Sequence, residues 1–85
     1  MTYDEVQKEI LAMISRILQG RNWDELSCDE LYHIYKDIQN RFSGIQWSTM
    51  PDDYQKAQAD LVVDTLNDIL DKMRKKNCNM KDYIK

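Results

Sequence analysis

The sequence predicts an all-α fold: an up-down-up three-helix bundle with a long third helix and a short C-terminal fourth turn. Its 85 residues include only two glycines and one proline, fewer turn residues than a sandwich or barrel needs. Apolar residues recur at helical spacing in three stretches, at about 3–18, 27–42 and 51–76. Each stretch carries residues typical of helix ends. We expect one domain, spanning residues 1–85.

The first helix is predicted from a capping box and an apolar stripe. Thr2 and Glu5 stand at the spacing at which each side chain can bond the backbone amide of the other. Gly20 follows the last apolar residue and can take the left-handed conformation that ends a helix. The stripe consists of Tyr3, Val6, Ile10, Met13, Ile14 and Ile17.

The second helix has the clearest start signal in the chain. Ser27 and Glu30 form a second capping box, and Leu26 and Leu31 match the hydrophobic staple that accompanies it. Gly44 is placed to end this helix. The predicted buried stripe consists of Leu31, Ile34, Tyr35, Ile38 and Phe42.

The third helix starts near Pro51, because proline is tolerated in the first turn. At roughly 38 Å it overhangs the other two by about two turns, and we expect Met73 in the overhang. The tail, residues 77–85, either folds back over this overhang through a short turn capped by Asn79, or a second protomer covers the overhang. We favour the tail. The buried stripe is predicted as Ala59, Val62, Val63, Leu66, Ile69, Leu70 and Met73.

Two connections share the pattern glycine, any residue, side-chain amide, tryptophan, at residues 20–23 and 44–47. An antiparallel bundle has a connection at each end, so Trp23 and Trp47 are predicted to cover opposite ends of the core. A chance similarity stays open as the alternative, since only two identities are involved.

The cysteines and the N-terminal residues indicate which cellular compartment the protein occupies. Cys28 and Cys78 are not a CxxC pair, and with His33 as the only histidine they cannot complete a tetrahedral zinc site. The acidic N-terminus lacks a signal-peptide pattern, and no stretch approaches the ~20 apolar residues of a membrane span. We therefore expect a cytoplasmic protein with two free thiols, no metal, no cofactor and no membrane partner; a disulfide remains an alternative.

Aspartates gather on the outer side of the third helix. Residues 45–71 carry six aspartates and one lysine, and Asp60, Asp64 and Asp68 follow one another at intervals of four. They form either a solvated face or a docking surface for a basic protein. Tyr54 and Leu61 would supply its apolar anchor, unless both pack under the 43–50 connection or the tail. Tyr32, at the edge of the second stripe, is a further candidate contact.

The C-terminal stretch is basic: residues 72–85 carry six basic residues and one aspartate. Its lysines and arginine could contact nucleic-acid phosphates, or they could complement the helix dipole and aid solubility. The net charge of −3 and the aspartates on the same helix disfavour nucleic-acid binding. The candidate phosphate contacts are Lys72, Arg74, Lys75 and Lys76.

The sequence contains no catalytic pattern. His33 is predicted to face water, no serine or cysteine stands in an arguable triad, and two glycines cannot build a phosphate loop. We therefore predict a non-enzymatic partner-binding protein, an adaptor, regulator or inhibitor that blocks a basic or nucleic-acid-binding protein through its acidic helix face. Small acidic helical proteins from phages and mobile elements provide a compositional analogy. Nucleic-acid binding through the basic end and a structural homo-oligomer along the third helix are the alternatives, with a monomer or homodimer expected.

Overall fold

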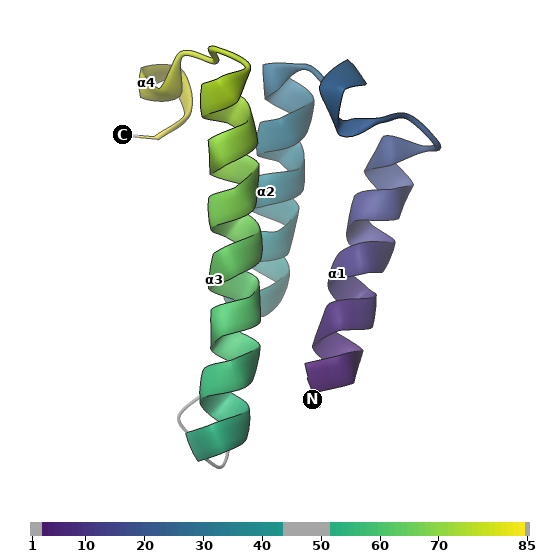
Figure 1. Cartoon of the computed structure of the whole chain (residues 1–85), viewed down its shortest axis with the longest axis vertical. Helices are drawn as coiled ribbons and strands as arrows, with labels where there is room; N and C mark the ends of the chain where they lie inside the picture. The colour runs from purple at the N-terminus through teal and green to yellow at the C-terminus, as the bar shows by residue number, and fades with distance from the viewer. Residues whose placement is uncertain (1–2, 44–51, 85) are drawn as a thin grey trace.

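The computed structural model describes residues 3–43 and 52–84, and their side chains at 3–43 and 57–84. It contains α1 (Tyr3–Leu18), a 3-10 turn η1 (Trp23–Glu25), α2 (Cys28–Ser43), α3 (Asp52–Lys75) and α4 (Met80–Tyr83). The three long helices run in alternating directions and pack against one another, with α4 beside the end of α3 (Figure 1). All regular structure in the described residues is helical, which confirms the predicted class.

The start of α2 is fixed by local hydrogen bonds. The Ser27 amide donates to Glu30 Oε1 and the Glu30 amide donates to Ser27 Oγ, both at 3.1 Å. Leu26 and Leu31 are buried beside them, at 0% and 1% exposure. The predicted capping box and staple are therefore both present. The first predicted box cannot be compared in the same way, because Thr2 lies outside the described residues.

Arg21 joins the end of α1 to the start of α2. Gly20 has the predicted positive φ, +83°, and turns the chain so that the Arg21 guanidinium returns to α1. There it donates to the carbonyls of Ile17 (3.0 Å) and Leu18 (3.1 Å), which have no partner within the helix. It also donates to Glu30 Oε2 at 2.6 Å, and this bond lowers the pKa of Glu30 and raises the pKa of Arg21.

The core receives side chains from all three long helices. Burying one large aliphatic side chain contributes about 1.5–3 kcal/mol, so this cluster is the main source of stability. At its margin, Arg41 of α2 pairs with Glu9 of α1, with Nη2 3.0 Å from Oε2. The buried apolar residues are Val6, Ile10, Met13, Leu26, Leu31, Ile34, Ile38, Phe42, Val62, Ile69, Met73 and Cys78.

The buried side of α3 differs from the predicted one. Val63 was assigned to the stripe but is 52% exposed, whereas Leu61 is half-buried against the core and Gln58 is fully buried. The centre of the buried side lies near Ile69, whereas the predicted stripe is centred on Leu66, about 60° away around the helix axis. Leu61 and Val63 are about 200° apart, so both cannot be buried, and the larger leucine faces the core.

Cys28 and Cys78 form a disulfide, so the expectation of free thiols is wrong. Their Cα atoms are 5.8 Å apart, although 50 positions separate them in sequence. Cys28 is the first residue of α2 and Cys78 follows α3, and helices that alternate in direction bring these two ends together (Figure 1). The expectation of free thiols was based on a reducing cellular compartment. It did not consider that alternating helices bring the two cysteines together.

The tail folds back over the same end of the molecule. Asn79 caps α4 by accepting from the Lys81 amide at 3.3 Å. The Tyr83 hydroxyl donates to Asp29 Oδ1 at 2.5 Å, and this bond raises the pKa of Tyr83. Met80 and Tyr83 pack against the core and Met73 is fully buried. The tail therefore covers the end of α3, as favoured from the sequence.

Trp23 occupies one of the two predicted core ends. It lies in η1 between α1 and α2, partly buried against the core cluster. Trp47, the second predicted cover, lies outside the described residues.

Candidate functional site

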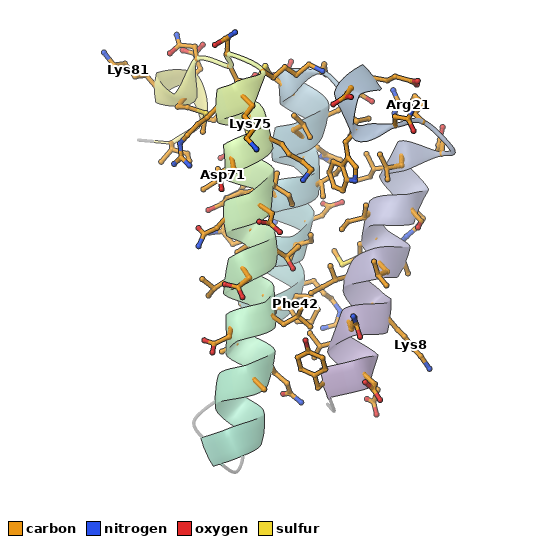
Figure 2. The ribbon with its side chains drawn as sticks, viewed as in Figure 1. Lys8, Arg21, Phe42, Asp71, Lys75 and Lys81 are labelled. Atoms are coloured by element: carbon orange, nitrogen blue, oxygen red, sulfur yellow. A yellow bond between two sulfur atoms is a disulfide. The ribbon has the colours of Figure 1, made fainter. Side chains whose placement is uncertain are left out.

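Three aspartates line the outer side of α3. Asp60, Asp64 and Asp68 are all exposed, as predicted, and we call them the acidic ridge. In the part of the chain whose side chains are described, none of the three has an ion-pair partner. Asp71, on the side of α3 that faces away from α1 in Figure 2, pairs instead with Arg74 at 2.9 Å.

The acidic ridge places like charges about 6 Å apart along the helix axis. Each such pair destabilises a helix by about 0.2–0.5 kcal/mol, and aspartate is a weaker helix former than glutamate. A basic surface laid against the ridge would remove this repulsion. The ridge can therefore attract cationic groups without any rearrangement of α3.

Val63 and Leu61 flank the acidic ridge on opposite sides, and Val63 is the more exposed of the two. Val63 is exposed and lies about 60° around the helix from Asp60, while Leu61 packs inward against the core. Leu61 remains partly exposed, so its role as an apolar contact stays a prediction. Tyr54, its predicted companion, has no described side chain.

Tyr32 contacts two other tyrosine rings within the protein. Its ring stacks on Tyr35, with centroids 5.8 Å apart, and Tyr83 of the tail lies 4.9 Å from it on α4. The side chain is only partly exposed. Tyr32 as a partner contact therefore stays a prediction, and any partner would also meet Tyr83 of the tail.

Three of the four predicted phosphate contacts have partners within the protein. Lys72 Nζ lies 5.1 Å from the centre of the Trp23 ring, and Lys76 Nζ donates to the Asp24 carbonyl at 2.7 Å. Arg74 is paired with Asp71. Among the described residues, only Lys75 of this set is exposed without such a contact. The basic end is thus used partly to fasten α3 to η1.

A pocket of about 350 Å³ lies where the end of α3 meets η1 and α2. Trp23 and Leu31 form its apolar wall, and the lysines at the end of α3 provide positive charge. Sequence reasoning named those lysines and Trp23 separately but did not bring them together, because about 50 residues lie between them. The lining residues are Trp23, Asp24, Leu31, Lys72, Lys75 and Lys76.

Other chemistry has little support in the described residues. His33 is exposed, as predicted, with Nε2 3.6 Å from Asp37 Oδ2. Across the part of the chain that could be searched, no three histidine, cysteine or acidic side chains are grouped as a metal site. Within that same part, no helix has the length and apolar character needed to cross a membrane.

No protein-family model matches the sequence, and no characterised protein or solved structure matches it significantly.

Proposed function

We propose that this protein is a small, non-catalytic partner-binding protein whose acidic ridge binds a basic surface of another protein. The observation that carries the proposal is the row of exposed carboxylates without ion-pair partners in the described chain: Asp60, Asp64 and Asp68. Val63, exposed beside them, supplies an apolar contact. In this proposal a closed up-down-up bundle is the rigid support that keeps α3 straight.

Electrostatics supports a basic partner in particular. A row of like charges accelerates association with an oppositely charged surface and selects against acidic proteins. A cleft that normally holds nucleic acid is lined with lysine and arginine, so the acidic ridge would take the place of the phosphates there. Such binding would inhibit the partner by occupying its surface.

The disulfide bears on where this happens. Reducing compartments keep thiols free, whereas disulfides persist in secreted and periplasmic proteins. The bond between Cys28 and Cys78 thus argues against the cytoplasmic location predicted from the sequence, and we propose an oxidising compartment. Alkylating the thiols before cell disruption tests this, because complete labelling of both cysteines would place the protein in a reducing compartment.

Replacing the ridge carboxylates is expected to abolish binding. In the variant Asp60→Asn/Asp64→Asn/Asp68→Asn we expect affinity for a captured basic partner to fall at least tenfold at about 50 mM salt, and its salt dependence to flatten. The partner is captured on the immobilised protein, identified by mass spectrometry, purified, and then titrated at about 50 and about 200 mM salt.

A matched control separates the ridge from net charge. Asp4→Asn/Glu25→Gln/Asp82→Asn removes the same number of exposed carboxylates from other elements, and it should retain the affinity within about twofold. Equal losses in the two variants, or no loss in either, would rule out the acidic ridge as the binding surface.

Nucleic-acid binding is the second candidate, because Lys72, Lys75 and Lys76 lie together with the aromatic Trp23. The acidic ridge on the same helix opposes it. No gel retardation of DNA or RNA at about 100 μM protein would exclude it. A homo-oligomer along α3 is less well supported, since two copies would oppose their like-charged ridges.

A further inference from the structure

The pocket at the end of α3 has the composition of a ligand site. Its volume of about 350 Å³ is at the lower end of the ~300–1,000 Å³ typical of small-molecule pockets. The partly buried Trp23 ring provides its apolar surface, and three lysines line it as well. Leu31 lies at the base of the pocket and belongs to the core, since it is only 1% exposed.

The charge of the pocket is unbalanced. Lys72, Lys75 and Lys76 stand within about one turn, and Asp24 is the only acidic residue among those that line the pocket. The excess of positive charge repels itself, and Asp24, the helix dipole, the Trp23 ring and the Asp24 carbonyl offset part of it. An anion placed between Lys72, Lys75 and Lys76 would be attracted by all three ammonium groups.

Two of the lysines are already held in position. Lys72 is seated over the Trp23 ring and Lys76 is bonded to the Asp24 carbonyl, so little side-chain freedom remains to be lost on binding. Lys75, labelled on the last turn of α3 in Figure 2, is exposed and can turn toward a ligand.

We infer that this pocket binds a small organic anion with a flat aromatic body, of the class of aromatic carboxylates and nucleoside monophosphates. The anionic group lies among the lysines, and the ring packs against Trp23. A simple inorganic anion would leave the apolar wall uncovered, and a long polyanion would meet Asp24 and the acidic ridge. The inference does not depend on the proposed partner binding, because the acidic ridge ends one turn before Lys72, the first lysine of the pocket.

Trp23 itself reports on occupancy. The chain has two tryptophans, so a Trp47→Phe background leaves the Trp23 indole as a single N–H signal in nuclear magnetic resonance spectra. Titration with AMP or 2-naphthoate is expected to shift this signal with a dissociation constant of about 0.1–1 mM. Inorganic phosphate alone should bind at least about tenfold more weakly, because it gains no contact with the apolar wall.

Matched lysine variants locate the anionic group. Lys75→Gln should weaken the binding of both aromatic probes about tenfold, through loss of a charge-assisted contact. Lys81→Gln removes the same charge from α4, outside the pocket, and should change binding less than about twofold.

Four results would overturn the inference. They are no Trp23 shift with either aromatic probe at about 5 mM, equal effects of the two lysine variants, equal affinity for inorganic phosphate and the aromatic anions, and affinity for single-stranded oligonucleotides that rises steeply with length. The last of these would instead favour the nucleic-acid alternative.

Discussion

Loss of the Cys28–Cys78 disulfide is expected to lower the free energy of unfolding by about 2–4 kcal/mol and the melting temperature by about 10–20 °C. The bond closes a loop across 50 positions, and a cross-link of that span restricts the unfolded chain by about 4 kcal/mol in the loop-entropy model. A domain of this size has a total stability of about 4–13 kcal/mol. The reduced protein is therefore expected to be marginally stable.

The measurement is urea unfolding of the oxidised protein, the reduced protein and the Cys28→Ser/Cys78→Ser variant. The last two should agree within about 1 kcal/mol, because both lack the same cross-link. The single variant Cys28→Ser also lacks the disulfide but keeps the Cys78 thiol. It serves as a control for the effect of replacing that second cysteine. An unfolding free energy that does not change on reduction would show that the two cysteines are not linked.

Met73→Ala is expected to cost about 2–4 kcal/mol, since it removes a fully buried side chain and leaves a cavity. The sequence placed Met73 in an overhang that either the tail or a second protomer had to cover. In the structure Met73 belongs to the core cluster together with Cys78, and Met80 of the tail packs against that cluster. The expected loss is therefore a property of the single chain.

Thermal unfolding of Met73→Ala at several protein concentrations checks this prediction. Met80→Ala, at a partly exposed position, is the control and should cost about 1 kcal/mol. If a second protomer covered Met73, the melting temperature of the parent protein would rise with concentration and the variant would lose that dependence. A concentration-dependent result would thus contradict the folded-back tail.

Local signals in the sequence were sufficient for the three long helices and for the helix ends whose signals lie within residues 3–43 and 52–84. The Ser27–Glu30 box, the glycine at position 20 and the Asn79 cap each depend on residues three or fewer positions apart. Such contacts form in the same way whatever the rest of the chain does. These features could therefore be predicted from sequence and are present in the structure.

Features that join distant segments could not be predicted in the same way. Apolar periodicity did not give the orientation of α3, because apolar residues lie on both sides of it and a buried polar residue, Gln58, breaks the pattern. The disulfide and the pocket both need the ends of α2 and α3 to be brought together. The exposed aspartates were predicted correctly because they remain on the outer side after a rotation of about 60°.

In the structure, α3 packs Leu61 against the core and exposes Val63 beside the acidic ridge. Replacing each of these two residues by glutamine tests this orientation of α3 most directly. Urea unfolding should show that Leu61→Gln lowers stability by about 1–2 kcal/mol. Val63→Gln should stay within about 0.5 kcal/mol of the parent, because glutamine is the better helix former at an exposed site. The reverse order, with Val63→Gln the costly change, would turn α3 back to the face that the sequence pattern favoured and remove Val63 from the proposed binding surface.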